Sequence, residues 1–571
     1  MQGRNIIGVP LPTIILTHII MRNLIAVLLL VFLAAPLTAC TDNNVSEGSG
    51  KTNIKSDNSS ITGIVTSNGK GVAGVVVSDG INVTTTDADG KYALPSDKKY
   101  GYVFISTPSG YETPLAGNQP QFFKRVTTGA KDIRETANFT LNKVDNQKHA
   151  VLAMADFHLA RRNNDVAQFE KVAADINQTA SELKAQGYRV YGVSLGDESW
   201  DGFWYSNHYA LPETFEDLQR ISMPFYHCMG NHDNDPYCPN DWSSEQAWIK
   251  VCGPVYYSFN AGDVHYVVID DIQYLNDGAS QGTIGKRDYN DVVISEEMAW
   301  LKKDLAALKD KTKPVVVAMH APLYADPTLS GQKQVDHDNV TNTKAFEQAF
   351  SGFSNVHVLS GHTHVDYNVK RVSNIREHNT AAVCATWWWT GKLSGVHVCT
   401  DGTPGGYGVY TWNGKDVKWY YKSSGFDKNY QFRAYDLNTV CISPAVYAPN
   451  YQADMKEAAH GYDKQRNDNE ILINVWNYDP DWKVEAIENG QALNVTRVYG
   501  YDPLHIIAYD AKRIQAGGKD KNSFKSTPTA HLFMAKASSA TSTVTIRVTD
   551  SFGNVYTEEM QRPKIFNINI K

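Results

Sequence analysis

The chain has 571 residues, of which 42% are hydrophobic and 20% charged, proportions that are ordinary for a folded globular protein. At about 150 residues per domain, this length predicts three or four units rather than one hydrophobic core. The formal net charge of −7 excludes a general electrostatic attraction to nucleic acid, so we expect no nucleic-acid partner.

The first 40 residues have the pattern of a secretion signal. Arg22 precedes an apolar run from Leu24 to Leu37, and the run ends in Leu37-Thr-Ala-Cys40, which resembles a bacterial lipobox. The resemblance implies cleavage before Cys40, lipidation of its thiol, and a membrane anchor in the cell envelope, on the periplasmic side or the cell surface. We expect translation to start at Met21. A retained transmembrane helix is the alternative, but the run is short for a span.

Residues 41–59 are mostly Asn, Ser, Gly, Lys and Asp, which predicts a flexible tether. An envelope location permits disulfides among the six remaining cysteines. The candidate pairs that lie near each other in sequence are Cys238–Cys252 and Cys384–Cys399, although sequence alone does not fix the pairing. The chain contains no CxxC motif, so a cysteine-based zinc site is not expected.

Residues 60–145 alternate short β-branched runs with Asn-Gly and Asp-Gly turn signals, which predicts a β domain. The text Gly71-Val-Ala-Gly-Val-Val-Val and Thr86-Asp-Ala-Asp-Gly-Lys-Tyr-Ala-Leu-Pro95 resembles the carboxypeptidase regulatory-like β-sandwich. That resemblance implies a spacer or binding module, and no catalytic motif is visible in this segment.

Residues 146–375 alternate predicted strands with predicted helices, which indicates an α/β layered domain. A helix is expected over residues 166–184, with its apolar positions on one face. A second helix is expected to begin at Ser295. The predicted strands are 151–155, 190–195, 224–229, 264–269, 315–319 and 356–360. Residues 376–571 return to short strands and are expected to form a second β-sandwich-like domain.

Polar side chains of a few types follow five of these strands. They are Asp156 and His158 after the first strand, Asp197 after the second, Asn231, His232 and Asp233 after the third, His320 after 315–319, and His362 and His364 after 356–360. Because ligands of open α/β sheets gather at the carboxyl ends of strands, we expect these groups to converge at one edge. The glycines before Asp197, Asn231 and His362 are expected to let the backbone turn sharply.

The residue types indicate a metal site. Carboxylate, imidazole and amide groups form a mixed donor set that suits Mn, Zn, Fe or Mg. There are too many donors for one ion, whereas two divalent ions bridged by a carboxylate would use them all.

The series D-x-H, GD, GNHD, H and GHTH, in that order over about residues 149–370, resembles the calcineurin-like metallophosphoesterases. The resemblance implies a four-layer α/β/β/α sandwich, here flanked by N- and C-terminal β-sandwich-like domains. It implies that one metal takes Asp156, His158 and His364, that the other takes Asn231, His320 and His362, and that Asp197 bridges them. A metal-bridging hydroxide would then hydrolyse a phosphate ester. His232, paired with Asp233 or a nearby acid, would face the leaving group.

Residues 377–565 resemble the C-terminal domain attached to a bacterial subset of this family, on the text Trp387-Trp-Trp-Thr-Gly391, Asp401-Gly-Thr-Pro-Gly-Gly-Tyr407 and Asn477 to Trp482. These aromatic and glycine-rich stretches either shape the substrate pocket or form core and turns. Trp200–Tyr209 and the arginines Arg161 and Arg162 could also lie at the site, whereas His227 and His265 are expected to be ordinary strand residues.

Several functions stay open. The leading hypothesis is a phosphoesterase acting outside the cytoplasm on a small-molecule phosphate ester or a phospho-glycan. Within that class, a phosphodiesterase or pyrophosphatase acting on nucleotides or phospho-glycans is the alternative to a broad phosphomonoesterase. A glycan-binding lipoprotein with a vestigial metal site is a reading of a different class, and the intact donor set argues against it. A nuclease is a third, since some members of the family are nucleases, but no basic groove is visible in the sequence.

Overall fold

The computed structural model describes residues 52–53, 59–518 and 523–570. Residues 51–571 form one compact unit. The predicted signal peptide, Cys40 and the predicted tether as far as residue 58 lie outside the described residues, apart from the two-residue strand β1 (Thr52–Asn53). None of the helices in the described part of the chain combines the length and the apolar character that crossing a membrane would require.

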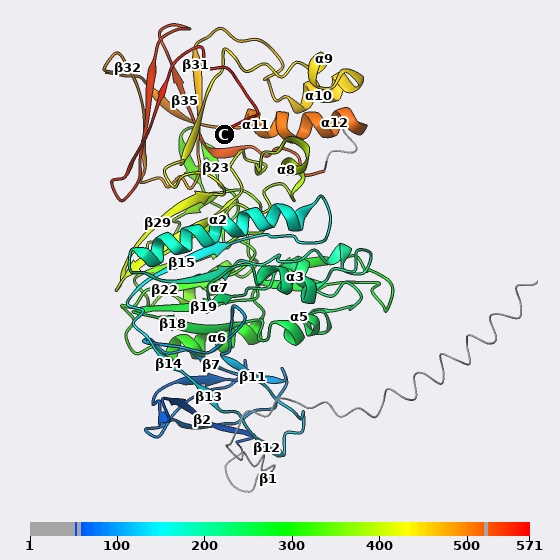
Figure 1. The fold of residues 1–571 in the computed structure, drawn as a ribbon, viewed down its shortest axis with the longest axis vertical. Coiled ribbons are helices and arrows are strands. Elements are labelled where there is room, and N and C mark those ends of the chain that lie inside the picture. The colour runs from blue at the N-terminus through cyan, green and yellow to red at the C-terminus, as the bar shows by residue number, and fades with distance from the viewer. Residues whose placement is uncertain (1–51, 54–58, 519–522, 571) are drawn as a thin grey trace, which may run out of the picture. The chain divides into compact units, whose positions relative to one another are not determined.

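The N-terminal segment forms two main sheets (Figure 1). One contains β1, β12 (Ile133–Thr136), β2 (Ile61–Ser67) and β13 (Phe139–Thr140), with β3 (Lys70–Gly71) and β6 (Lys91–Leu94) also paired to β2. The other has the order β11 (Phe123–Arg125), β7 (Tyr102–Ser106), β4 (Val76–Ser78) and β5 (Val83–Thr85). Short pairs join β8 (Tyr111–Glu112) with β14 (Asn142–Lys143) and β9 (Leu115–Ala116) with β10 (Gln119–Pro120). The predicted β-rich character of this segment is therefore confirmed.

Two larger sheets follow. The first has the order β17 (Phe225–Tyr226), β16 (Arg189–Ser194), β15 (Lys148–Met154), β28 (Gly406–Asn413) and β29 (Asp416–Ser423). The second has the order β18 (Tyr257–Ala261), β19 (Val264–Val268), β22 (Val315–Ala318), β25 (Val356–Ser360), β27 (Ile375–Asn379) and β26 (Tyr367–Val369). β15, β16 and β17 are parallel, as are β19, β22, β25 and β27. Parallel neighbours bring the carboxyl ends of these strands to a common edge within each sheet.

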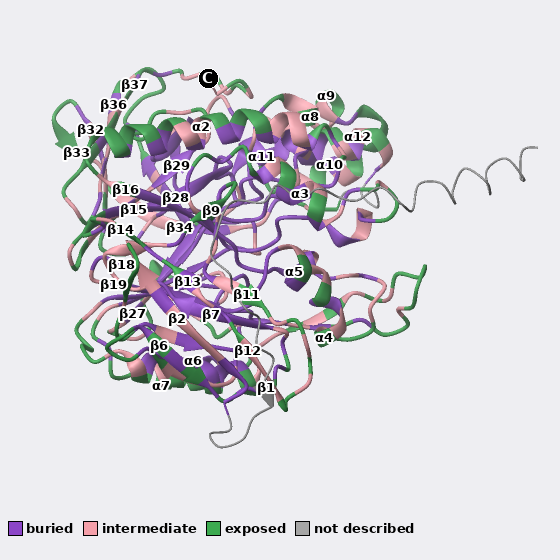
Figure 2. Ribbon diagram, turned by 60° about the horizontal axis from the view of Figure 1, so that its bottom comes forward, coloured by how far each residue is buried: buried purple, intermediate pink, exposed green. Residues whose placement is uncertain are grey.

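Alternation along β15 divides the core. Val151 and Ala153 pack with residues of the second sheet, whereas Leu152 and Met154 pack against α2 (Asp165–Ala185). The expected buried face of α2 is confirmed, including Phe169, Ile176 and Leu183. Buried residues fill the central strands and exposed residues line the outer sides of the helices (Figure 2). Pleating therefore gives the first sheet an apolar contact on both faces.

The remaining helices of this region are short, apart from α6. They are α3 (Leu211–Leu218), α4 (Asp241–Ser244), α5 (Gln246–Val251), α6 (Ser295–Ala307), α7 (Thr343–Ala349) and α8 (Trp389–Ser394). The predicted helix start at Ser295 is confirmed. Two small hairpins stand apart from the main sheets: β20 (Ile272–Leu275) with β21 (Asp288–Asp291), and β23 (Thr328–Ser330) with β24 (Lys333–Val335).

The C-terminal segment has two four-stranded antiparallel sheets. One is β30 (Phe432–Asp436), β31 (Glu470–Val475), β35 (Thr529–Lys536) and β34 (Val495–Gly500); the other is β33 (Gln491–Ala492), β32 (Lys483–Glu488), β36 (Val544–Thr549) and β37 (Val555–Met560). Helices α9 (Pro444–Tyr447), α10 (Gln452–Ala458), α11 (Pro503–His505) and α12 (Ala511–Gly517) lie beside the first of these sheets (Figure 1). The molecule thus has a mixed α/β fold with many sheets.

Three features differ from the sequence-based expectations. The strand predicted over 224–229 covers only Phe225–Tyr226, because the amides of the next two residues bond to the Tyr257 and Ser194 hydroxyls rather than to a strand. The hairpin β28–β29 lies beyond the predicted boundary at residue 375 yet pairs with β15. Neither candidate disulfide forms, and all six cysteines from Cys228 to Cys441 are free.

A buried ion pair in the N-terminal domain gives a pH-dependent contribution to stability. The Lys98 ammonium donates to Glu135 at 2.8 Å and to the Ile133 carbonyl at 2.7 Å, and its side chain is 0% exposed. Burial opposes ionisation of Glu135, but hydrogen bonds from Lys98 and Thr127 outweigh burial and lower its pKa from 4.5 to about 2. A carboxylate with a depressed folded pKa stabilises the fold above its unfolded pKa and loses that contribution as the pH falls.

We therefore expect Glu135→Gln to lower the free energy of unfolding by a constant amount above pH 5. The deficit should shrink as the pH falls from about 4.5 toward 2, because there the wild-type carboxylate also becomes protonated on unfolding. Hydrogen exchange of the N-terminal domain measures this. A deficit that is the same at pH 3 and pH 7 would contradict the assignment.

Candidate metal centre

The five strand ends bring all seven predicted ligands together. Asp156 and His158 follow β15, Asp197 follows β16, Asn231 lies beyond β17, His320 follows β22, and His362 and His364 follow β25. All are buried except His362, which is half-buried. They form two groups that meet at Asp197.

The first group contains Asp156, His158 and His364. The Nε2 atoms of His158 and His364 are 2.9 Å apart, and Asp156 Oδ1 lies 3.3 Å from His364 Nε2 and 3.7 Å from His158 Nε2. Asp197 Oδ2 lies 3.5 Å from His158 Nε2. Four donor atoms therefore face one small volume.

The second group contains Asn231, His320 and His362. Asn231 Oδ1 lies 3.0 Å from His320 Nε2, and His362 Nδ1 lies 3.1 Å from the same nitrogen. Asp197 Oδ2 lies 3.3 Å from His320 Nε2. The same carboxylate oxygen thus faces both groups, which is the arrangement expected of a bridging ligand.

Hydrogen bonds behind the donors orient them. Asp156 Oδ2 accepts the His362 amide at 2.9 Å, and Asp197 Oδ1 accepts the His232 amide at 2.8 Å. His320 Nδ1 donates to the Leu195 carbonyl and His364 Nδ1 to the Ala385 carbonyl, both at 2.8 Å. These bonds leave the Nε2 atoms and one oxygen of each carboxylate facing inward. Asp156 Oδ1 is buried without a hydrogen-bond partner, as expected of an atom that waits for a cation.

The electrostatics agree with a cation-binding role. Burial lowers the pKa of His158 to about 4 and of His362 to about 3, so both imidazoles are neutral and able to coordinate metal at pH 7. His320 differs: burial opposes its protonation, but Asp197 and Asp156 raise its pKa to about 10. The proton on His320 offsets the negative charge of Asp197 and Asp156, and a bound cation would take over that role.

The backbone at this centre is strained. Asp156, His158, Asp197, His362 and His364 all have positive φ, between 44° and 69°, a region that costs a non-glycine residue about 1–3 kcal/mol. The glycines act in two different ways. Gly196 has φ 83°, as the expected turn requires. A Cβ at Gly230 would instead lie 2.3 Å from the Asp197 amide nitrogen and Oδ1, so Gly230 is needed for space.

His232 lies beside the two groups and is held by an acid. Its Nδ1 donates to Asp201 Oδ1 at 2.7 Å. Arg287 Nε donates to Asp201 Oδ2 at 2.6 Å, and the Tyr274 hydroxyl donates to the same oxygen at 3.1 Å. The expected partner of His232 was either Asp233 or another nearby acid, and the structure shows that it is Asp201.

Asp233 has a different surrounding. Its carboxylate accepts the amides of Glu198, Ser199 and Gly230 at 2.9–3.2 Å. These bonds fix the loop after β16 against the loop after β17. Asp233 therefore positions the loops that carry Asp197 and Asn231 rather than the His232 ring.

Aromatic side chains from distant parts of the chain border the centre. Trp387 stacks on His364 with ring centroids 3.8 Å apart, and Phe524 stacks on Trp387 at 3.9 Å. Trp200 lies 5.3 Å from His158 and 5.8 Å from His232. Trp387 thus shapes the site, whereas its neighbour Trp388 is buried and donates to the Phe157 carbonyl.

The Arg162 guanidinium covers this border, 4.4 Å from the Trp200 ring and 4.5 Å from the Phe203 ring. Arg162 and Trp200 are among the residues that the sequence suggests for the site, whereas Arg287 and Phe524 are not. Arg287 lies in the β20–β21 hairpin and Phe524 in the C-terminal domain, and neither has a local motif that marks it.

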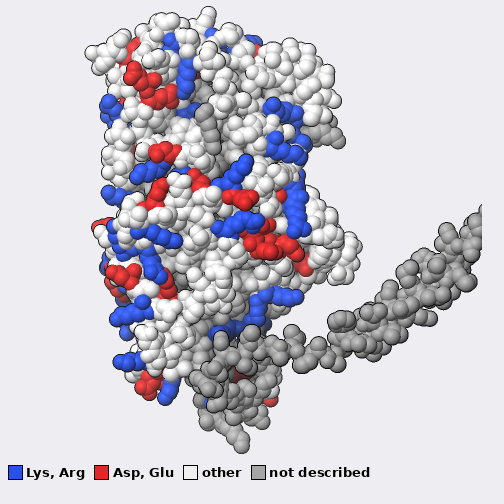
Figure 3. Space-filling model, viewed as in Figure 1, with Lys and Arg blue, Asp and Glu red and all other residues white. Residues whose placement is uncertain are grey.

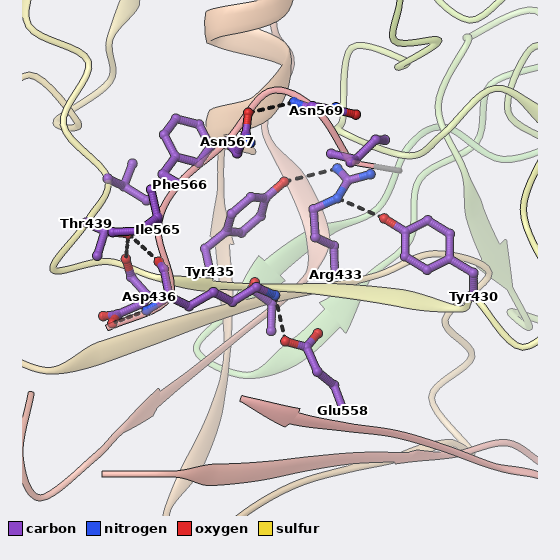
Figure 4. Close-up of a pocket in the computed structure, with 14 residues that line it drawn as sticks. Tyr430, Arg433, Tyr435, Asp436, Thr439, Glu558, Ile565, Phe566, Asn567 and Asn569 are labelled. Carbon is purple, nitrogen blue, oxygen red and sulfur yellow. Dashed lines mark hydrogen bonds and ion pairs between the residues drawn. The ribbon is translucent and has the colours of Figure 1, made fainter. Parts of the chain in front are cut away.

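Other polar groups belong elsewhere. His227 and His265 are buried beside Glu198 and Asp304, at 2.7 and 2.8 Å. His265 is a strand residue of β19, as expected, whereas His227 lies just beyond the end of β17. Cys384 Sγ lies 3.8 Å from His364 Nδ1, but that nitrogen already binds a carbonyl, and burial raises the pKa of the thiol well above its ordinary value. A cavity of about 280 Å³ in the C-terminal domain, lined by Tyr430, Arg433, Tyr435 and Phe566 among others (Figure 4), contains none of the candidate ligands.

Comparison with known families assigns the three segments. The calcineurin-like phosphoesterase model matches residues 149–366, and the models for the N terminal and the C terminal of calcineurin-like phosphoesterase match residues 59–144 and 377–556. The chain carries a calcineurin-like phosphoesterase domain. It is therefore a hydrolase of the metal-dependent phosphoesterase type, and its His and Asp groups could hold metal ions. The resemblance of residues 60–142 to a carboxypeptidase regulatory-like domain stays a prediction.

No curated protein matches the chain. Among solved structures, a dimetal phosphatase from Danio rerio is 12% identical, covering 48% of this chain and 96% of its own at a TM-score of 0.34. The purple acid phosphatase PPD1 from yellow lupin is 12% identical, with coverage of 60% and 57% and a TM-score of 0.33. A putative 5'-nucleotidase from Staphylococcus aureus is 12% identical, with coverage of 48% and 53% and a TM-score of 0.30.

The contact at Gly230 gives a direct test of the geometry. Gly230→Ala should displace Asp197, because the added Cβ would lie 2.3 Å from it. We expect bound metal to fall and turnover to drop by about a hundredfold, the loss typical of a misplacement of about 1 Å. Gly352→Ala is the matched control, since nothing lies within 4 Å of a Cβ there. Equal activity of the two variants would contradict the close approach.

Proposed function

We propose that this protein hydrolyses phosphate esters at a dinuclear metal site in the cell envelope, anchored to a membrane through lipidated Cys40. The observation that carries the catalytic part is Asp197 Oδ2, which lies 3.5 Å from His158 Nε2 and 3.3 Å from His320 Nε2 and so faces both donor groups. The lipobox resemblance supports the location. The resemblance of the motif series over about residues 149–370 to the calcineurin-like metallophosphoesterases supports a four-layer α/β/β/α order for the central domain, flanked by two β-sandwich-like domains.

The donor sets divide between two ions. Asp156, His158 and His364 would hold one, and Asn231, His320 and His362 would hold the other, with Asp197 shared. Two divalent ions, of Mn, Zn, Fe or Mg, would act as Lewis acids toward phosphoryl oxygens and would lower the pKa of a bound water molecule toward neutrality. The carbonyls of Leu195 and Ala385 accept from Nδ1 of His320 and His364, respectively. These bonds direct the Nε2 atom of each ring toward the ions.

His232 is placed to move a proton. The Asp201 carboxylate accepts from Nδ1, which leaves Nε2 as the nitrogen that would donate to the departing oxygen of the ester. Arg287 and Tyr274 hold Asp201 in turn. The ring thus has a fixed orientation before substrate arrives, which is how a general acid gains its advantage over water.

The aromatic border indicates which part of the substrate it would meet. Trp200, Trp387 and Phe524 offer apolar ring faces, and the Arg162 guanidinium lies against the same wall. Such a wall favours an ester whose alcohol part is cyclic, either a sugar or an aromatic ring. This supports a phospho-glycan or nucleotide substrate and leaves open the choice between monoester and diester.

Charge on the outer surface does not favour a polyanionic partner. On the face shown in Figure 3, Lys and Arg side chains of the described residues are interspersed with Asp and Glu side chains. We keep the prediction that nucleic acid is not a partner.

Metal dependence is the first test. Metals would be stripped from residues 41–571, and Mn, Zn, Fe or Mg added back singly, with para-nitrophenyl phosphate and its bis-para-nitrophenyl diester as substrates. We expect metal-dependent turnover that Asp197→Asn abolishes, because loss of the bridge uncouples the two groups. The preferred ester distinguishes monoesterase from diesterase. A protein that retains no metal and hydrolyses neither ester would instead be a binding lipoprotein.

A leaving-group series tests His232. If its Nε2 protonates the departing oxygen, His232→Ala should cost about 10²–10⁴-fold in kcat for alkyl phosphates and much less for para-nitrophenyl phosphate, whose leaving group needs no proton. Asp201→Asn should show the same trend in weaker form. A loss that is equal across the series would assign His232 to binding rather than to proton transfer.

A further inference from the structure

A second group of acids lies away from the predicted ligands. A cavity of about 120 Å³ is lined by Asp241, Glu245, Asp270 and Glu297, together with Glu296 and the rings of Tyr100, Trp242 and Tyr256. The acids come from α4, the turn before α5, the end of β19 and the first turn of α6, whereas Lys99 and Tyr100 come from the N-terminal domain. The cavity therefore lies where the N-terminal and catalytic segments meet.

These acids are deeply placed and poorly compensated. Glu297 is 1% exposed, Glu245 6% and Asp270 7%. Among the described residues lining the cavity, only Lys99 is basic, and its ammonium binds the Glu296 carboxylate at the outer side. A buried carboxylate normally has a cationic partner or a full set of hydrogen bonds.

The hydrogen bonds available do not satisfy the cluster. Glu297 Oε1 accepts the Asp270 amide at 2.9 Å, Asp270 Oδ1 accepts the Ile272 amide at 3.1 Å, and Asp241 Oδ1 accepts the Tyr274 amide at 2.7 Å. Each of these bonds uses one oxygen of its carboxylate. The Glu245 carboxylate has no hydrogen-bond or ion-pair partner among the described residues, although the residue is more than nine-tenths buried.

The acids also repel one another. Burial raises the pKa of Glu245 well above its ordinary value, and Asp270 and Asp241 raise it further. Burial likewise raises the pKa of Asp270 and of Glu297. A site that concentrates carboxylates in this way gains most from a small cation of charge two.

We propose that this cavity binds a hard divalent cation, Ca²⁺ or Mg²⁺, held by Glu245, Asp241, Asp270 and Glu297. The donors are all oxygens, with no imidazole or thiolate, which separates this site chemically from the catalytic one. No three of these described carboxylates place oxygens within 4.8 Å of one another, as the catalytic donors do. At most two of these carboxylates therefore bind the cation directly, and the others reach it through water, for which the cavity has room.

The cation would add to the polar contacts that already join these segments, such as the bond from Gln119 Nε2 to the Cys252 carbonyl and that from Trp300 Nε1 to Ser78. It connects α4–α5 with α6 and lies against Tyr100 of the N-terminal domain, whose hydroxyl donates to Glu296 at 3.0 Å. Asp270 is followed by Asp271, whose Oδ1 accepts the His320 amide at 3.0 Å. The role of the site is thus structural, fixing the N-terminal domain and the strand end behind the catalytic centre.

Calorimetric titration with CaCl₂ or MgCl₂ tests this, using the protein from residue 41 with its catalytic metals already bound. We expect uptake of one further ion, and the two titrations decide between Ca²⁺ and Mg²⁺. Glu245→Gln should weaken its Kd by about tenfold or more, since one charged ligand is lost without a change of shape. Glu297→Gln should act in the same direction, and Glu559→Gln, an exposed acid of the C-terminal domain, should bind as the wild type does.

Two readouts separate this site from the catalytic one. Asp197→Asn should abolish turnover but keep the extra ion, whereas Glu245→Gln should keep turnover within about threefold and lose the ion-dependent rise in Tm. Without added cation, Glu245→Gln should melt no lower than the wild type, because it removes a buried acid. The proposal is overturned if no further ion is taken up, if Asp197→Asn loses it while Glu245→Gln keeps it, or if methylammonium binds in its place.

Discussion

The catalytic domain is organised around one carboxylate. Asp197 follows β16, its Oδ1 accepts the amide of His232, and its Oδ2 faces an imidazole from each side. Both neighbouring groups come from other strands, so their positions relative to Asp197 depend on the register of the sheets. Parallel pairing of β15 with β16 in one sheet, and of β22 with β25 in the other, provides that register. The centre therefore depends on strands of two sheets rather than on any single loop.

Such convergence has a conformational cost that the surroundings must offset. Five of the ligands have positive φ, and each such residue is destabilising by about 1–3 kcal/mol. Backbone amides that donate to Asp156 and Asp197, and three loop amides that donate to Asp233, hold the loops in this state. Strain of this kind persists only where neighbouring contacts fix the backbone. Asp233, which provides several of these contacts, is therefore buried as deeply as the ligands.

Much of this could be read from the sequence, for physical reasons. A continuous apolar run predicted the strand that forms β15, the helical period predicted the buried side of α2, and donor types after each strand predicted which residues converge. What failed depended on partners far away in the chain. The strand at 224–229 shortens because hydroxyls of Tyr257 and Ser194 take its amides. The role of Gly230 depends on Asp197, and Phe524 reaches the site only through the folding of the C-terminal domain.

The hairpin β28–β29 has a consequence for how the molecule is made. β15 pairs with β16 on one side and with β28 on the other, so without residues 406–423 its outer hydrogen-bonding groups form an open edge. During synthesis the ribosome has delivered every candidate ligand by residue 364, yet the sheet that carries Asp156 is not closed until residue 423. For a time, the nascent chain therefore contains every candidate ligand while the edge of β15 that will pair with β28 is still open. The segment that contains the ligands ends at residue 364, whereas the segment needed to complete their sheet ends at residue 423.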